Sequence, residues 1–381
     1  MYKAYETSFR GQRLSFGEKF WNISFSYVLM IMLLGAIGVI VLYSAANGSW
    51  NPWASKQLMR FCLGFAVMFA LAFVDLRWFL RYAYWFYLVV LLLLVAVEIG
   101  GHIGMGAQRW INLGFMKLQP SELMKIALVL ALARYFNSAT LQSIESIKGI
   151  VAPAAMVMVP VVLVMIQPDL GTAIMLLLTA GAMFFAVGVQ LWKFAALLCA
   201  GAAAMPVAWH FLHNYQKNRV LTFLDPERDP LGAGYHIIQS KIALGSGGVF
   251  GKGFLGGTQS HLNFLPEKHT DFIFTMLSEE FGMIGGIVVI AINFMIIAYS
   301  YFFALRSASY FAKLMTVGLA SSYFLYVVIN ISMVLGMLPV VGVPLPLISY
   351  GGTVIVSVMM GFGIILAANS NRMINIGKDQ G

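Results

Sequence analysis

Long apolar runs, interrupted only briefly by polar residues, are the feature that most limits how this chain can fold. Of its 381 residues, 60% are hydrophobic and 10% are charged, and the mean hydropathy is +0.83. Soluble domains are far more polar, whereas each helix that crosses a bilayer needs about 20 apolar residues. We therefore expect an all-α polytopic membrane protein of about ten transmembrane helices with a single membrane domain.

The apolar runs place this membrane domain at residues 23–368, between polar tails at 1–22 and 369–381. The ten expected spans, in chain order, are Ile23–Tyr43, Leu58–Val74, Tyr82–Val97, Pro120–Phe136, Gly149–Ile166, Leu170–Val189, Phe194–Leu212, Phe272–Tyr301, Leu319–Leu338 and Leu347–Ala368. Residues 214–270 are polar and predict one long loop between spans 7 and 8. We expect short amphipathic helices in that loop, for example around His236–Leu244, lying on the membrane surface.

The distribution of Lys and Arg predicts the orientation in the membrane. With the N-terminus in the cytoplasm, 13 of the 24 Lys and Arg residues fall in inner segments, which agrees with the positive-inside rule and puts both termini in the cytoplasm. The other 11 gather at the outer face: Lys56, Arg60, Arg109, Lys117, Lys125, Lys217, Arg219, Arg228, Lys241, Lys252 and Lys268. Either a long loop crosses despite its charge, or the outer face handles a polyanionic ligand. We expect no nucleic-acid partner, because cations in a membrane protein hold loops and meet anionic lipids or substrates.

Several charged residues lie at the predicted outer ends of the spans. Glu122 and Lys125 are three residues apart on one helix face, so they either pin two spans together or form the wall of a polar cavity with Lys125 available to a phosphate. Arg109, in the semi-polar segment Gly100–Leu118, is an interfacial anchor or a phosphate ligand. Asp169, before span 6, is a helix cap or a residue at the rim of a cavity.

Three carboxylates open span 8, which is more than capping requires. Thr270 or Asp271 can cap this helix, and the helix dipole favours an ionised Asp271. Glu279 and Glu280 have structural or gating roles. The sequence Gly251–Gly256 matches the glycine pattern of dinucleotide sites but lacks the strand and helix around it, so we expect no nucleotide cofactor.

Seven segments of the chain resemble the SEDS family (shape, elongation, division, sporulation). They are GAQRWINLG at 106–114, QPSELMK at 119–125, QPDLGTA at 167–173, GSGGVFGKGFLGGTQ at 245–259, LPEKHTDFIF at 265–274, EEFG at 279–282 and PVVGVPLPLISYGG at 339–352. The sequences of residues 253–272 and 339–349 are similar to the corresponding segments of family members that act in cell elongation and rod-shape maintenance rather than in division. The resemblance covers nearly the whole chain.

This resemblance implies a peptidoglycan glycosyltransferase that polymerises lipid II at the outer face of the bacterial cytoplasmic membrane. It also implies ten spans, cytoplasmic termini and Asp271 as the essential catalytic residue. The partners that it implies are a class B penicillin-binding protein, which is a transpeptidase, and the elongation complex with MreB, MreC and MreD.

Chemistry of this kind assigns roles to the same residues. Forming a β-1,4 bond from an α-linked donor inverts the anomeric carbon, so Asp271 can act as general base on the acceptor hydroxyl. Arg109 and Lys125, with Lys252 and Arg219 as further candidates, would contact the departing pyrophosphate. Mg²⁺ or Mn²⁺ could assist, held by Asp271, Asp169 or Glu122.

Two other functions remain open at this point. A lipid II flippase would also use buried charge pairs and spans interrupted by proline. The gathering of charge at one face favours chemistry there over transport. A scaffold of the elongation complex would not require Asp271.

Overall fold

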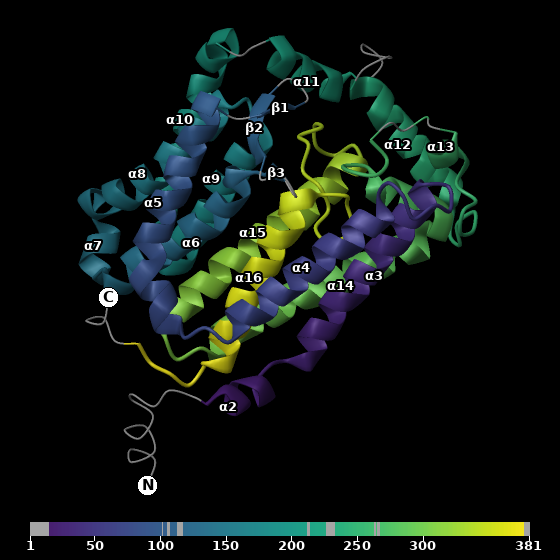
Figure 1. Cartoon of the computed structure of the whole chain (residues 1–381). Coiled ribbons are helices and arrows are strands. Elements are labelled where there is room, and N and C mark those ends of the chain that lie inside the picture. The colour runs from purple at the N-terminus through teal and green to yellow at the C-terminus, as the bar shows by residue number, and fades with distance from the viewer. Residues whose placement is uncertain are drawn as a thin grey trace.

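The computed structural model is a bundle of long helices with a group of shorter elements at one end (Figure 1). It describes residues 15–100, 102–104, 107–112, 117–211, 214–225, 233–262, 264 and 267–376. The helices are α2 (Phe16–Trp21), α3 (Phe25–Ala45), α4 (Ala54–Ala72), α5 (Leu76–Gly100), α6 (Pro120–Ser138), α7 (Leu141–Glu145), α8 (Ile147–Ile166), α9 (Leu170–Val187), α10 (Leu191–Phe211), α11 (Asn214–Leu224), α12 (Ala233–Gly247), α13 (Thr258–His261), α14 (Ile273–Arg306), α15 (Tyr310–Val334) and α16 (Gly352–Ser370).

Ten of these helices correspond to the ten predicted spans: α3, α4, α5, α6, α8, α9, α10, α14, α15 and α16. Within the described residues, eight are long and apolar enough to cross a membrane. The exceptions are α6, which carries Glu122, Lys125 and Arg134, and α10, whose apolar part Leu191–Pro206 is shorter. The membrane fold predicted from the apolar runs is confirmed.

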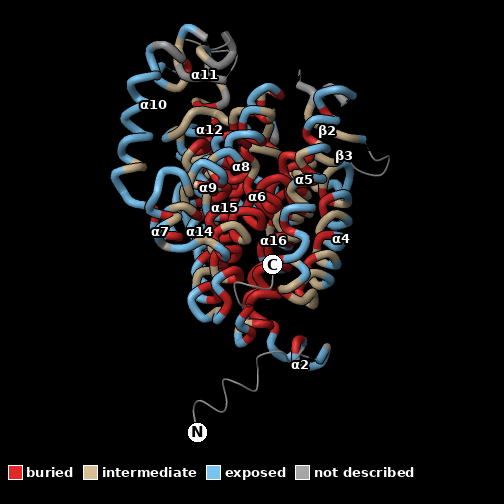
Figure 2. Tube along the Cα trace, turned by 90° about the vertical axis from the view of Figure 1, so that its left-hand side faces the viewer, coloured by how far each residue is buried: buried red, intermediate tan, exposed pale blue. Residues whose placement is uncertain are grey.

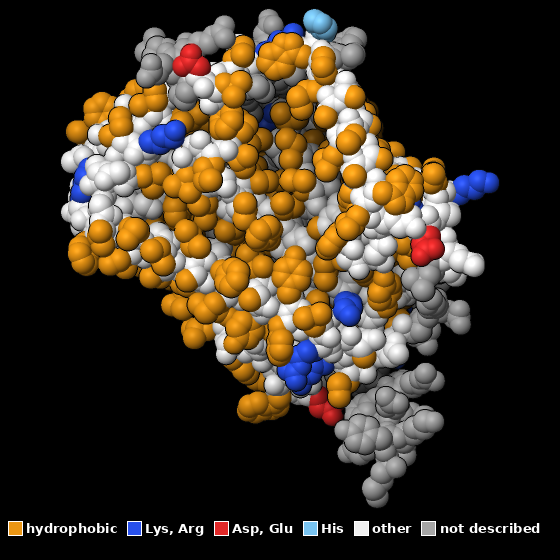
Figure 3. All heavy atoms as spheres, turned by 180° about the vertical axis from the view of Figure 1, so that it is seen from behind, with side chains coloured by type: hydrophobic (Ala, Val, Ile, Leu, Met, Phe, Trp, Pro, Cys, Tyr) orange, Lys and Arg blue, Asp and Glu red, His pale blue; other side chains and the backbone are white. Residues whose placement is uncertain are grey.

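The core lies where α6, α15 and α16 meet. α15 packs against α6, α9 and α14, while α16 packs against α4. Buried residues concentrate in this centre, whereas α10 is exposed along most of its length (Figure 2). Hydrophobic side chains cover most of the rear face (Figure 3), as expected for helices that contact lipid.

The semi-polar segment after α5 forms a small antiparallel sheet. Its strands are β1 (His102–Gly104), β2 (Ala107–Asn112) and β3 (Lys117–Leu118), in the order β1-β2-β3. The described residues are otherwise almost entirely helical, so the predicted helical membrane class is confirmed, with this small sheet as an addition that the sequence did not predict. The sheet satisfies backbone groups of an extended segment and places Arg109 on its central strand.

The predicted helix around His236–Leu244 is present as α12, but it packs onto the bundle. Its residues Ile237, Ser240 and Ala243 are buried. The Ser240 hydroxyl donates to the carbonyl of Val334, 2.8 Å away, and lies 2.8 Å from the Thr275 hydroxyl. α12 therefore fastens the polar loop to α14 and α15.

α14 is broken at Gly282, whose φ of 66° and ψ of −165° are not helical. The glycine-rich segment after α12 fills the gap with backbone hydrogen bonds. The amide of Met283 donates to the carbonyl of Gly248 at 2.9 Å, and the amide of Lys252 donates to the carbonyl of Glu279 at 3.0 Å. A helix break needs such substitute partners when its backbone is buried.

Candidate active site

A cavity of about 410 Å³, within the usual range for small-ligand sites, lies where the N-terminal ends of α6, α9 and α16 meet the side of α15 at Tyr326. Its wall also includes β2 and the segments 267–271 and 342–351. The lining residues are Arg109, Trp110, Gln119, Glu122, Lys125, Asp169, Thr172, Met175, Glu267, Thr270, Asp271, Tyr326, Gly342, Val343, Pro344, Tyr350, Gly351, Gly352, Thr353 and Val354. Five of the predicted site residues, far apart in the sequence, therefore meet in one cavity: Arg109, Glu122, Lys125, Asp169 and Asp271.

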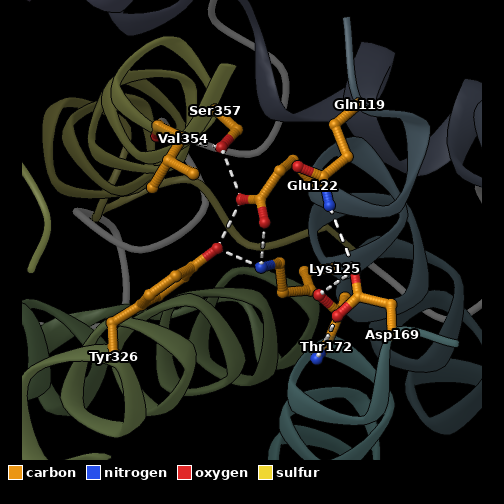
Figure 4. A network of polar contacts seen from close by, with 8 residues as sticks. All are labelled: Gln119, Glu122, Lys125, Asp169, Thr172, Tyr326, Val354 and Ser357. Carbon is orange, nitrogen blue, oxygen red and sulfur yellow. Dashed lines mark hydrogen bonds and ion pairs between the residues drawn. The ribbon is translucent and has the colours of Figure 1, made fainter. Parts of the chain in front are cut away.

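Glu122 and Lys125 form a buried ion pair on the first turns of α6, with 2.7 Å between Lys125 Nζ and Glu122 Oε1. α6 begins at Pro120, where the missing N–H of proline costs nothing. The Tyr326 hydroxyl donates to Glu122 and accepts from Lys125, while the Ser357 hydroxyl donates to Glu122 over 3.3 Å (Figure 4). The pair thus joins α6 to α15 and α16 and also lines the cavity, whereas the contact of Lys125 with a phosphate stays a prediction.

Asp169 is the N-cap of α9 and also lines the cavity. Its carboxylate accepts from the Thr172 amide at 3.2 Å and the Thr172 hydroxyl at 2.9 Å. The Gln119 side chain donates to the same carboxylate over 3.1 Å (Figure 4). The predicted cap is confirmed, and its contact with Gln119 ties the start of α9 to the start of α6.

Arg109 ties the central strand β2 to the turn between α8 and α9. Its Nε donates to the Gln167 carbonyl at 3.0 Å, and its Nη2 donates to the Pro168 carbonyl. A guanidinium has five N–H donors, so this anchoring leaves donors for a ligand in the cavity.

Asp271 lies in the turn before α14, not in the helix itself. The N-cap is Phe272, which makes no side-chain capping bond, so the predicted capping by Thr270 or Asp271 is wrong. The Thr270 hydroxyl instead donates to the Glu267 carboxylate at 2.7 Å. The Asn330 side chain donates to the Asp271 carbonyl at 2.9 Å and to the Val343 carbonyl at 2.7 Å, which fixes both cavity segments to α15.

Lys252 does not line the cavity. Its Nζ lies 2.7 Å from Glu279 Oε1 and donates to the Thr258 hydroxyl at 2.7 Å. Glu279 is fully buried there and also accepts from the Gln259 amide at 2.9 Å. The Ser44 hydroxyl donates to Glu280 at 2.5 Å. Glu279 therefore holds the polar loop against α14, and Glu280 holds α3 against α14. These contacts agree with structural roles for the two glutamates rather than gating roles.

Arg219 lies on α11, and its side chain is outside the described residues. Its proposed contact with phosphate stays a prediction from the sequence.

Sequence reasoning missed several residues of the wall. Glu267 adds a fourth carboxylate, and Tyr326 adds the hydroxyl between Glu122 and Lys125. A tyrosine in mid-span carries no sequence signal that distinguishes it from packing residues. The segment Gly342–Val354 also lines the cavity, and its signal in the sequence is the family motif at 339–352.

The charged residues of the cavity wall are unbalanced. Arg109 and Lys125 carry two positive formal charges, while Glu122, Asp169, Glu267 and Asp271 carry four negative ones, so the sum is −2. Among the described residues, no group of three or more His, Cys, Asp or Glu side chains is placed to hold a metal ion by itself. Mg²⁺, however, commonly uses one or two carboxylates together with substrate phosphates. The wall fits that kind of shared site.

Comparison with known proteins identifies the family. Residues 24–374 match the family model of FtsW, RodA and SpoVE, described as cell cycle proteins. The peptidoglycan glycosyltransferase MrdB of Escherichia coli K12 is 42% identical over 359 residues, which are 93% of this chain and 96% of the relative.

Two solved structures have the same fold. One, from a study of polymerization and crosslinking by a peptidoglycan synthase complex, has a TM-score of 0.80 at 32% identity and covers 92% of this chain and 98% of its own. The rod shape determining protein RodA of Thermus thermophilus has a TM-score of 0.70 at 27% identity, with 92% and 97% covered. The resemblance predicted from the motifs is confirmed: this chain belongs to the FtsW/RodA/SpoVE family.

Proposed function

We propose that this chain is a peptidoglycan glycosyltransferase that joins lipid II disaccharides into β-1,4 glycan strands during cell elongation. The observation that carries the proposal is the cavity that brings Asp271 together with Arg109 and Lys125 at one end of the bundle. It combines a carboxylate for acid–base work with cations for a phosphate. The MrdB relative, which is 42% identical to this chain, is named for this activity.

Asp271 acts as the general base in the proposed reaction. Its carboxylate takes the proton of the acceptor 4-hydroxyl as that oxygen attacks the anomeric carbon of the donor. The new C1–O4 bond forms while the bond from C1 to the pyrophosphate oxygen breaks. The electron pair leaves with the polyprenyl pyrophosphate, and the anomeric carbon is inverted without a covalent enzyme intermediate.

Arg109 and Lys125 bind the leaving pyrophosphate. Arg109 is held by backbone carbonyls, so its remaining donors are fixed in direction before substrate binds. Lys125 is held by Glu122 and Tyr326, which orient its ammonium at the cavity wall. Fixed donors stabilise developing charge without reorganisation during the reaction.

A divalent cation, Mg²⁺ or Mn²⁺, would fit beside Asp271 or Asp169. The formal charge of −2 on the wall opposes an anionic pyrophosphate, and a bound cation supplies charge neutralisation at phosphate oxygens. Glu122 suits this role less, because it is ion-paired with the Lys125 ammonium, whose positive charge would repel a bound cation. The base and metal-ligand roles of Asp271 are alternatives.

The chain is a multi-pass protein of the bacterial inner membrane, and we place the cavity at its outer face. α2 and the C-terminal end of α16 lie at one end of the bundle, whereas α11 to α13 lie at the other (Figure 1). The positive-inside rule assigns the first end to the cytoplasm. Lipid-linked disaccharide would then reach the cavity from the outer leaflet.

The partner that we propose is a class B penicillin-binding protein, a transpeptidase that crosslinks the strands. One relative of known structure comes from a study of polymerization and crosslinking by a peptidoglycan synthase complex. The elongation complex with MreB, MreC and MreD is proposed from the family resemblance alone.

Polymerisation by the purified protein together with its transpeptidase partner tests this function. Labelled lipid II with Mg²⁺ or Mn²⁺ should yield glycan strands with the wild type and none with Asp271→Ala. Asp225→Ala is the control, because this exposed aspartate follows α11 in the same polar loop. Normal polymer from Asp271→Ala would reject the catalytic assignment. Transfer of lipid II across the membrane without polymer would favour the flippase. The absence of both polymerisation and transfer would favour the scaffold.

A further inference from the structure

Arg60, on α4, carries a guanidinium that is only partly paired. Its Cζ lies 4.6 Å from the centroid of the Tyr350 ring, and its Nη1 is buried without a hydrogen-bond partner. The ion pairs of the described residues join Lys125 to Glu122 and Lys252 to Glu279, so none involves Arg60. A buried charged donor without a partner is costly, which points to a compensating ligand.

Arg60 lies directly behind the cavity wall. Tyr350, Gly351 and Gly352 line the cavity, and a Cβ added to Gly352 would come within 3.6 Å of Arg60 Cζ. Gln57, one turn earlier on α4, donates to the carbonyls of Leu347 at 3.3 Å and Ser349 at 3.0 Å. α4 therefore holds this segment from the side opposite the cavity.

The surroundings of Arg60 are positive. Lys56 is exposed and precedes Arg60 by four residues, so the two share a helix face. α4 contains no Asp or Glu. α16 begins beside Arg60, with no acidic residue in its first turn and no side-chain cap, and its dipole favours an anion there.

Apolar side chains continue from this positive group along α4. Met59 and Leu63, three residues after Lys56 and Arg60 respectively, have exposed fractions of 62% and 43%. A ligand with an anionic head and a long apolar tail would match both parts of this surface. A soluble anion would match only the positive part of this surface.

We infer that Lys56 and Arg60 form a binding subsite for the pyrophosphate of a second lipid-linked substrate, beside the cavity that holds the first. This inference rests on the proposed function, in which a bond forms between two sugars that each carry a polyprenyl pyrophosphate. The wall of the cavity carries only two cations, Arg109 and Lys125, which the proposed function already assigns to one pyrophosphate. Lys56 and Arg60 supply two more positive charges on the other side of Tyr350–Gly352.

Binding of undecaprenyl pyrophosphate to the full chain, in nanodiscs of neutral phosphatidylcholine, tests the subsite. The wild type should bind two molecules. Arg60→Gln should keep one and bind the second about tenfold more weakly, as expected for the loss of a contact to a charged group. Arg60→Lys, which keeps the charge, should recover part of the loss.

Arg134→Gln is the matched control. The Arg134 guanidinium also lies over a tyrosine ring, that of Tyr84, at 4.5 Å, and it donates to the Arg81 carbonyl. It is on the last turns of α6, whereas the cavity is at the start of that helix. This variant should bind both molecules as the wild type does.

Unchanged binding by Arg60→Gln would overturn the subsite. If phosphatidylglycerol in the nanodisc displaces the second molecule as well as unlabelled undecaprenyl pyrophosphate does, the site takes anionic lipid in general and the substrate assignment is wrong. Should Arg60→Gln fail to fold, Lys56→Gln carries the test, because Lys56 is exposed. Repeating the titration with Asp271→Ala separates the two proposals, since this binding needs no turnover.

Discussion

The Lys125 ammonium lies 2.7 Å from the Glu122 carboxylate, and both side chains are at most 5% exposed. Removing one member of a buried pair leaves the other charge uncompensated, which costs about 3–5 kcal/mol. We expect Glu122→Gln and Lys125→Met each to lower the free energy of unfolding by that amount. The double variant should lose less than the sum of the two, as a double-mutant cycle of unfolding in detergent would measure. Strictly additive losses would show that the two charges do not interact.

Tyr326 is expected to affect catalysis beyond its effect on stability. Tyr326→Phe removes the hydroxyl that bonds to both Glu122 and Lys125, so Lys125 loses its orientation at the cavity. We expect at least a roughly tenfold lower polymerisation rate, since misplaced groups cost heavily in catalysis. Tyr323→Phe is the control, because it removes a buried hydroxyl that donates to Asn293 Oδ1 at 2.6 Å. Equal rates for both variants would count against a role in orientation.

The sequence predicts the helices better than the contacts between them. Apolar runs mark the spans because the bilayer sets their length, and Pro120 and Asp169 mark helix starts through local chemistry. The meeting of Tyr326 with Glu122, 204 residues apart, depends on how α6 and α15 pack. No local pattern encodes that packing, so the hydroxyl could not be foreseen.

The polar loop shows the same limit. The sequence predicts that Lys252, within the glycine-rich segment Gly245–Gly257, contacts the departing pyrophosphate. In the structure, the backbone of this segment instead makes hydrogen bonds to the residues around the break in α14, and Lys252 forms an ion pair with Glu279. Charge and glycine content predict a polar, bendable segment, but they do not tell which buried carboxylate it meets.

Lys252 should therefore matter for stability and not for substrate binding. Lys252→Met leaves the fully buried Glu279 without its cation, and we expect a loss of about 3 kcal/mol in unfolding free energy. Affinity for undecaprenyl pyrophosphate should remain that of the wild type at a temperature where the variant is folded. Lys125→Met is the comparison, because it should weaken binding as well. Weaker binding by Lys252→Met would restore Lys252 as a phosphate ligand.

Gly282 is expected to tolerate no side chain. Its φ of 66° with a ψ of −165° belongs to a region that only glycine adopts readily. A Cβ there would lie 2.3 Å from the Gly251 amide nitrogen and 2.4 Å from the Val249 carbonyl oxygen. Gly282→Ala should cost at least ~2 kcal/mol of unfolding free energy. Gly245→Ala in α12, where a Cβ meets nothing within 4 Å, should be neutral or stabilising. Similar unfolding midpoints for the two variants would contradict the observed break.

His269 should make stability depend on pH. Burial lowers the pKa of this imidazole, the charge of Glu267 raises it, and the charge of Lys268 lowers it. The ring stacks on Trp53, with the centroids 4.4 Å apart, and its Nδ1 is buried without a hydrogen-bond partner. The neutral form is therefore the one that fits the folded protein.

The sign of the effect follows from the lowered pKa. As pH falls through about 6.5, the unfolded chain binds a proton at His269 that the folded protein resists, so stability decreases until the folded pKa is passed. We expect the unfolding temperature of the wild type to fall more than that of His269→Gln between about pH 7.5 and about pH 5.5. His210→Gln, at an exposed histidine of α10, should behave as the wild type. If the unfolding temperatures of His269→Gln and the wild type changed equally with pH, the His269 ring would not be the source of the pH dependence.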